Sequence, residues 1–254
     1  MIIELSYVSV AFAIGVLVGL TGVGGGAVMT PVLIVGFGIN PVTAVATDLV
    51  FAAVTKISAG FVHGKSGSVD WTSVRRLWVG SIPGVVLGIV VLTIISGQHL
   101  WLVGSFLAVL ILITGISMIR TQGTSNHKQI KATRASFSGG FIGFAVATTS
   151  VGAGALGMTA LKAMMSDRDP KKLVATDIVH AVPISLLAGA SYSFAGFLDW
   201  SLLGWLLLGS IPGAILGSLQ SGKIDAVFLR KILGVVLVFA AVGLMLKFLF
   251  PAGP

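Results

Sequence analysis

The sequence predicts an all-α polytopic membrane protein with two inverted repeats, each with a glycine-broken helical segment plus three transmembrane helices. Three observations lead to this fold class. Of the 254 residues, 56% are hydrophobic and only 9% are charged, against roughly 25% charged in an ordinary soluble domain. The first half of the chain recurs, motif by motif, in the second half. Lys and Arg gather in loops that one topology places on a single side of a membrane.

Several continuous apolar runs are long enough to cross a bilayer, which takes about 20 residues in a helix. They lack the ~10-residue alternating pattern of membrane β-strands. We therefore expect transmembrane helices at 42–62, 71–95, 100–120, 174–194 and 231–250. The first apolar run follows Met1-Ile2-Ile3-Glu4-Leu5, which lacks the basic region of a signal peptide, so we expect that run to stay in the protein.

Two motifs recur at an offset of 129 residues. Val45-Ala46-Thr47-Asp48 returns as Val174-Ala175-Thr176-Asp177, and Gly80-Ser81-Ile82-Pro83-Gly84 returns as Gly209-Ser210-Ile211-Pro212-Gly213. The second motif is typical of closely packed helices. The chain therefore divides into a first transmembrane repeat at 1–120, a basic cytoplasmic linker at 121–135 and a second transmembrane repeat at 136–254.

A third repeated motif interrupts the first apolar segment of each half. Thr21-Gly22-Val23-Gly24-Gly25-Gly26 matches Thr149-Ser150-Val151-Gly152-Ala153-Gly154. The segment 5–38 either crosses once or enters and returns. If it returns, the basic loop residues fall on one side, and the loops around Gly38, Gln98 and Asp199 carry no Lys or Arg. The positive-inside rule then predicts inverted repeats in the cell inner membrane, with both termini periplasmic.

Broken helices at matching positions of inverted repeats point to a site near the bilayer midplane. Each break precedes a short helix, at 27–37 and 155–165, whose N-terminal N–H groups suit an anion. Alternatively, the glycines only allow close packing and the threonines bond back to their own helices. The predicted substrate-binding residues are Thr21, Gly22, Gly24, Gly25, Gly26, Thr47, Thr149, Ser150, Gly152, Gly154 and Thr176.

Four ionisable residues lie in or near these helices. Asp48 and Asp177 follow repeated prolines by one to two turns, where a carboxylate indicates a function. We predict that they carry protons or hold a cation, or that both cap N–H groups of broken helices. Lys56 is expected to complement the substrate charge, to pair with Asp48 or to reach the cytoplasmic interface. His180, at i+3 from Asp177, is either a proton relay or a hydrogen-bonded bundle histidine.

Composition excludes several functions. Without cysteine, there is no disulfide or iron–sulfur cluster. The 16 Lys and Arg against 8 Asp and Glu lie mostly in short loops, where they orient the chain, so the expected partner is the lipid bilayer rather than a nucleic acid. Only Asp48, Asp177 and His180 offer catalytic groups, so we predict no enzyme, no metal and no cofactor. A channel would show a more continuous polar pathway.

The duplicated glycine motif, followed by Pro31 and by Ala46-Thr47-Asp48, resembles the TauE/SafE family of sulfite exporters, also called the toluene sulfonate uptake permease family. The resemblance covers about 10–246. It implies a secondary transporter of a small sulfur-containing anion: sulfite, an organosulfonate such as sulfoacetate, or a related oxyanion. Asp48 and Asp177 stand where many members carry serine. Combined with the breaks, the resemblance predicts proton-coupled alternating access, with an anion channel or an intramembrane enzyme as alternatives.

Overall fold

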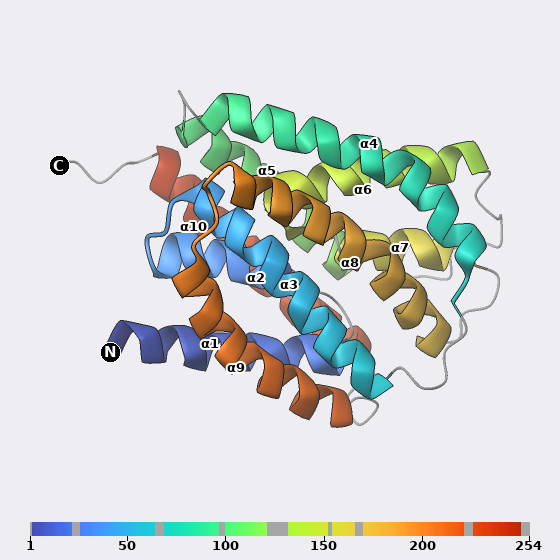
Figure 1. Cartoon of the computed structure of the whole chain (residues 1–254), viewed down its shortest axis with the longest axis horizontal. Coiled ribbons are helices and arrows are strands. Elements are labelled where there is room, and N and C mark those ends of the chain that lie inside the picture. Colours follow the sequence, from blue (N-terminus) through green and yellow to red (C-terminus); the bar gives the residue numbers. More distant parts are fainter. Residues whose placement is uncertain are drawn as a thin grey trace.

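The computed structural model describes residues 2–21, 26–63, 69–96, 100–120, 132–151, 154–165, 170–220 and 226–249. Within these ranges the chain is helical and contains no strand, so the predicted all-α class is confirmed (Figure 1). The first half forms α1 (Ile2–Thr21), α2 (Gly26–Pro31), the π-helix η1 (Val32–Gly36), α3 (Pro41–His63), α4 (Trp71–Ser96) and α5 (Leu100–Arg120). The second half forms α6 (Ala132–Thr149), α7 (Ala155–Met164), α8 (Pro170–Phe194), α9 (Trp200–Leu219) and α10 (Ala226–Leu249).

Both halves follow the same order of elements: a long helix, a short helical segment and three further long helices. The short helices predicted after the breaks are α2 with η1, and α7. Pro41 and Pro170 are the first residues of α3 and α8. Proline fits there because a first-turn N–H has no partner within the helix.

Seven of the described helices are long and apolar enough to cross a membrane. They contain the five predicted runs, the last of them as far as Leu249, and two further spans, Ile3–Leu20 in α1 and Trp200–Leu219 in α9. The helix α6, which corresponds to α1, falls short of this criterion because it contains Arg134 and several Ser and Gly residues. The chain is thus built as a multi-pass membrane protein.

The first long helix of each half packs against the other half. α1 lies along α9, and α6 lies along α4. A Cβ atom added at Gly213 would overlap the backbone of Phe12, and one added at Gly84 would overlap the backbone of Gly140. Helix backbones in both pairs therefore touch, as small residues allow in membrane proteins. This confirms the packing role predicted for the two Gly-Ser-Ile-Pro-Gly motifs.

α3 and α8 correspond to each other in the repeat and pack against each other. Gly60 of α3 lies against Ile178 of α8, whereas Gly189 of α8 lies against Val50 of α3, so the two helices run antiparallel. α5 and α10, also a corresponding pair, run antiparallel as well. Inverted repeats require such pairs. The inversion across a membrane stays a prediction, and these directions support it.

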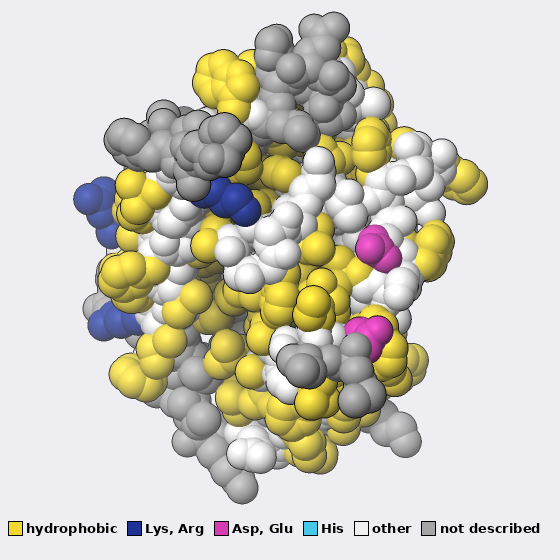
Figure 2. Space-filling view, turned by 90° about the vertical axis from the view of Figure 1, so that its left-hand side faces the viewer, with side chains coloured by type: hydrophobic (Ala, Val, Ile, Leu, Met, Phe, Trp, Pro, Cys, Tyr) yellow, Lys and Arg dark blue, Asp and Glu magenta, His cyan; other side chains and the backbone are white. Residues whose placement is uncertain are grey.

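The start of α1 and the end of α10 lie at the same end of the molecule (Figure 1). The connections from η1 to α3 and from α8 to α9 lie there too. Figure 2 looks at this end and shows two acidic side chains close together among hydrophobic ones. The start of α4, whose first turns carry the exposed Arg75 and Arg76, lies toward the opposite end. Which end faces the periplasm stays a prediction.

Candidate functional site

Two carboxylates lie inside apolar helices with no exposure to solvent: Asp48 in α3 and Asp177 in α8. The repeat places both about two turns after the proline that begins their helix. Burying a charged carboxylate costs several kcal/mol unless hydrogen bonds or an opposite charge compensate it, as a rough general figure. The partners of each aspartate therefore decide what it does.

Asp48 is bonded to the short helix that follows the first break. The backbone N–H of Thr30, on α2, donates to Asp48 Oδ2 over 3.1 Å. The Thr30 hydroxyl donates to the same oxygen. Asp48 thus holds α2 against α3. One role suggested by the sequence was a hydrogen bond from a broken-helix N–H to this carboxylate, and the Thr30 N–H makes such a bond.

Ser150, from the break of the second half, lies beside the Asp48 carboxylate. Its hydroxyl is a hydrogen-bond donor to that carboxylate, and apart from this contact neither the buried hydroxyl nor the buried Asp48 Oδ1 has a hydrogen-bond partner among the described residues. Ser150 also has a φ of 59°, a left-handed conformation that costs a non-glycine residue about 1–3 kcal/mol. Two buried polar groups, one from each half, therefore face each other at a strained point of the second break.

The helices around the second break are ordered by local hydrogen bonds. The Thr149 hydroxyl donates to Ala145 O over 2.7 Å and accepts from the N–H of Val151 over 3.1 Å. Gly154 precedes the first residue of α7 without a side-chain cap. Thr149 is therefore occupied by its own segment, whereas the Ser150 hydroxyl of this break faces Asp48 of the other half.

Asp177 has a different partner. Lys56 Nζ, on α3, lies 2.5 Å from Asp177 Oδ2, so the ion pair joins the two halves. Lys56 is only 3% exposed. The two expectations that Lys56 reaches the cytoplasmic interface or pairs with Asp48 are therefore wrong. α3 and α8 cross so that the lysine faces the aspartate of the other repeat, which spacing along α3 alone did not reveal.

His180 lies one turn beyond Asp177 and is fully buried. Its Nε2 is 3.0 Å from the hydroxyl of Ser81, on α4. Because that hydroxyl donates its only proton to Leu77 O, Nε2 must carry a proton and donate to Ser81. Nδ1 is then an acceptor, and it has no partner in the described part of the chain. The histidine is hydrogen-bonded on one side and open to a proton on the other.

Thr47 and Thr176 lie next to the aspartates but bond to other helices. The Thr47 hydroxyl accepts from the N–H of Asp199 over 3.3 Å, and the Thr176 hydroxyl accepts from the N–H of Asp70 over 3.1 Å. Thr176 also donates to its own helix at Lys172 O, as one alternative expected. Each threonine thus ties its helix to the start of a helix in the other half.

Some of the predicted binding residues fall outside the described residues: Gly22, Gly24, Gly25 and Gly152, together with the side chain of Thr21. Gly26 is the first residue of α2. The predicted roles of these residues stay predictions.

Sequence reasoning missed Thr30 and the bond from Ser81 to His180. A signal for the first was present, because Met29-Thr30 recurs as Met158-Thr159 at the offset of the other motifs. Ser81 stands inside a motif that was interpreted as packing alone. Repeated polar residues inside apolar helices indicate a structural or functional contact, as repeated charges do.

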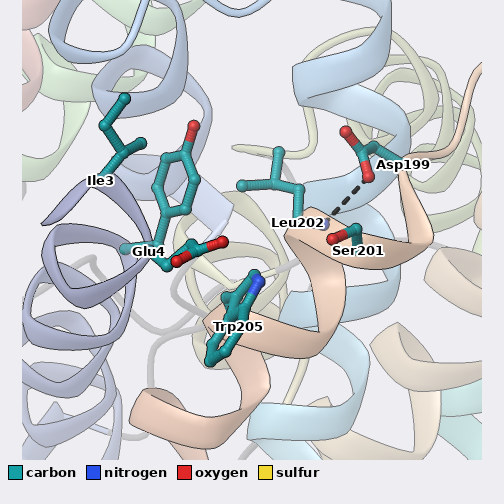
Figure 3. A pocket seen from close by; sticks show the side chains of 7 residues that line it. Ile3, Glu4, Asp199, Ser201, Leu202 and Trp205 are labelled. Carbon is teal, nitrogen blue, oxygen red and sulfur yellow. Dashed lines mark hydrogen bonds between the residues drawn. The ribbon is translucent and has the colours of Figure 1, made fainter. Parts of the chain in front are cut away.

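A cavity of about 680 Å³ opens at the end of the molecule that carries both described chain ends. It lies between α1 and α9, where Glu4, Trp205 and Asp199 face a common space (Figure 3). The remaining lining residues are Ile3, Tyr7, Ser201 and Leu202. Its two carboxylates would repel an anion, so we place the candidate site at the buried residues between the halves instead.

A model of the sulfite exporter TauE/SafE family matches residues 7–244. The chain belongs to this family. This TauE/SafE protein is 32% identical over 255 residues to the probable membrane transporter protein YjnA of Bacillus subtilis (strain 168), covering 95% of this chain and 100% of that one. It is 25% identical to a probable membrane transporter protein of Xylella fastidiosa (strain 9a5c), with 90% of each chain covered. No solved structure matches it.

The family and these relatives identify a membrane transporter rather than an enzyme. The residues just described fit that role, because they place buried polar groups where two related halves meet. No group of three or more His, Asp or Glu residues among the described side chains is placed to hold a metal ion.

Proposed function

We propose that this TauE/SafE protein is a secondary transporter of a small sulfur-containing anion in the cell inner membrane. The expected substrates are sulfite, an organosulfonate such as sulfoacetate, or a related oxyanion. Transport is proton-coupled and proceeds by alternating access at a site between the two broken segments. Both chain termini face the periplasm, in keeping with the basic residues on the other side.

The buried polar atoms that face each other between the halves carry this proposal. Ser150 Oγ and Asp48 Oδ1 are buried and, apart from each other, lack hydrogen-bond partners among the described residues, although buried polar groups are nearly always hydrogen-bonded. They belong to opposite halves: Ser150 lies at the second break, and Asp48 lies in α3, bonded to the short helix that follows the first break. Groups kept unsatisfied in one state of a transporter are suited to receive a substrate or a proton in another.

An anion finds suitable chemistry here. The Ser150 hydroxyl is a hydrogen-bond donor beside Asp48, and Lys56, about two turns further along α3, supplies a buried positive charge opposite Asp177. Charge-assisted hydrogen bonds of this kind are roughly twice as strong as neutral ones. Sulfite and sulfonates present several oxygens to such donors, and these polar groups are suited to binding them.

Proton coupling has three candidate groups: Asp48, Asp177 and His180. Each has a buried atom that lacks a hydrogen-bond partner among the described residues, namely Asp48 Oδ1, Asp177 Oδ1 and His180 Nδ1. A proton bound at any of them offsets the charge of an entering anion. The contacts between the halves suit alternating access, because α1 packs closely against α9 and α4 packs closely against α6. In the proposed movement, these two pairs rock against α3 and α8.

Flux in proteoliposomes tests the proposal. Uptake of radiolabelled sulfite is measured under an imposed pH gradient, with thiosulfate, chloride and a panel of sulfonates as competitors. We expect saturable uptake that rises with the gradient and is inhibited by sulfonates. Uptake that does not saturate and ignores the gradient would indicate a channel, and no uptake or competition by any sulfur anion would exclude the proposed substrate class.

A further inference from the structure

The ion pair between Lys56 and Asp177 is enclosed by the protein. Lys56 is 3% exposed and Asp177 is 0% exposed, and their charged atoms lie 2.5 Å apart. Only one carboxylate oxygen of Asp177 takes part, because Oδ1 has no hydrogen-bond partner in the described ranges. A buried ion pair with unsatisfied atoms contributes little net stability. The burial of this ion pair therefore needs an explanation other than a contribution to the stability of the fold.

The repeat shows that the architecture does not require this pair. Lys56 corresponds to Ser185, and His180 corresponds to Phe51, so the second half has no lysine at the point equivalent to Lys56 and the first half has no histidine at the point equivalent to His180. Asp48 is nevertheless buried and bonded at the same position of its helix. The two helices thus pack with the pair on one side and without it on the other.

Among the described side chains, few groups face Asp177. Lys56 reaches it from α3, and His180 lies one turn away on α8 itself, where the charge of Lys56 also acts on it. From α4, the neutral Ser81 contacts His180, while Arg75 and Arg76 are exposed. The described side chains of α6 and α7 include no charged group. A proton and an anion entering here would meet this lysine, this aspartate and this histidine.

We propose that Asp177 is a resident counter-anion, which occupies Lys56 in the empty transporter and yields that place to the substrate when it accepts a proton. The proposal rests on the proposed function and names the coupling group. The proposal assigns the relay of the proton to His180, one turn along α8, whose Nδ1 is an acceptor without a partner in the described structure.

The exchange balances in protons and charge. A proton forms an O–H bond at Asp177 Oδ1, the Lys56 hydrogen bond to Oδ2 breaks, and the substrate oxygen accepts that bond instead. The empty site carries one positive and one negative charge. The loaded site carries the lysine, a neutral carboxylic acid and a monovalent anion, and again sums to zero. One proton therefore accompanies each monovalent anion.

Infrared difference spectroscopy of the purified protein in lipid tests this exchange. Methanesulfonate is the probe, because it stays a monovalent anion at neutral pH. We expect its binding to produce the C=O stretch of a protonated carboxylic acid. The band should be lost in Asp177→Asn and retained in Asp48→Asn. Glu4→Gln, an acid of the end cavity, is the matched control and should retain the band.

Binding affinity gives a second readout. If Asp177 is ionised in the empty protein and takes up one proton with the anion, the apparent Kd should rise about tenfold for each unit by which the pH increases. In Asp177→Asn the Kd should become independent of pH. Lys56→Gln combined with Asp177→Asn keeps a neutral polar pair, so it is expected to fold and to lose binding.

Three results would overturn the proposal: binding without a carboxylic acid band, a band that survives Asp177→Asn but is lost in Asp48→Asn, or binding by the double variant equal to wild type. If chloride or nitrate protonates Asp177 while no sulfur anion binds, the exchange stands and the proposed substrate class fails. If none of these anions binds, both fail.

Discussion

Asp48 and Asp177 occupy the same position in two copies of one motif, yet they have different partners. Asp48 accepts two hydrogen bonds from Thr30 of the adjacent short helix. Asp177 accepts a hydrogen bond from Lys56 of the opposite half. The repeats differ here at Lys56 against Ser185 and at Phe51 against His180, and the lysine gives Asp177 its charged partner. The repeat thus provides the same helix position twice, and differences at single residues give the two aspartates different roles. Asp48 anchors a broken segment, whereas Asp177 faces a positive charge.

The largest effect is expected from removing the lysine of this comparison. Lys56→Met leaves Asp177 buried without its opposite charge and should lower the free energy of unfolding by about 3–5 kcal/mol. Adding Asp177→Asn should recover most of that loss. Chemical unfolding in detergent measures both.

Ser185→Ala is the matched change in the other half and should cost much less, because that side chain carries no charge. A loss from Lys56→Met that Asp177→Asn does not recover would contradict the ion pair as the reason for the destabilisation.

The close helix contacts, in contrast, should respond alike in both halves. Gly84→Ala and Gly213→Ala each place a Cβ against a neighbouring backbone and should each destabilise the protein by about 1–3 kcal/mol. Gly204→Ala, on the same helix as Gly213, meets no atom within 4 Å and should be close to neutral. Thermal unfolding compares the three variants. If Gly204→Ala were the most damaging of them, the close packing of α1 against α9 and of α4 against α6 would be contradicted.

The anchoring role of Asp48 can be tested at its donor. Thr30→Val removes the hydroxyl that donates to Asp48 and should cost about 1–3 kcal/mol of stability, because a buried acceptor loses a partner. Thr30→Ser keeps the hydroxyl and should retain most of the stability. Equal losses in the two variants would point to packing of the Thr30 methyl group instead.

The smallest effect is expected at the strained serine. Ser150→Gly removes a side chain from a residue with a φ of 59° and should raise stability by about 1 kcal/mol. It also gives the second break the glycine that the first has at Gly22. If the Ser150 hydroxyl contacts the anion, affinity for sulfite should fall while stability rises. A variant that loses stability and keeps full affinity would contradict both expectations.

Much of the fold was predictable from the sequence, because membrane helices follow from apolar length and the repeat shows which elements correspond. The five predicted runs and both short helices are present. The pairing of α1 with α9 and of α4 with α6 was not predictable. A repeat identifies equivalent elements, whereas their contacts depend on how the two copies interlock in space.

The sequence predicted which ionisable residues are buried at the site, but it did not predict which residues they contact. The buried Asp48, Asp177 and His180 follow from charges in apolar helices. The pairing of Lys56 with Asp177 depends on the crossing of α3 and α8, and one sequence does not contain that register. Thr30 was overlooked because a threonine in an apolar helix gives a weak signal unless its repeat is noticed.

Gradient-driven uptake of methanesulfonate, measured in parallel with its binding for Asp48→Asn and Asp177→Asn, would decide whether the two aspartates have separate tasks. We expect Asp177→Asn to bind the anion and to lose the response of uptake to a pH gradient. Asp48→Asn should weaken binding, since α2 loses its anchor, while the remaining uptake still follows the gradient. Equal loss of binding and of the gradient response in both variants would contradict the division of roles between the halves.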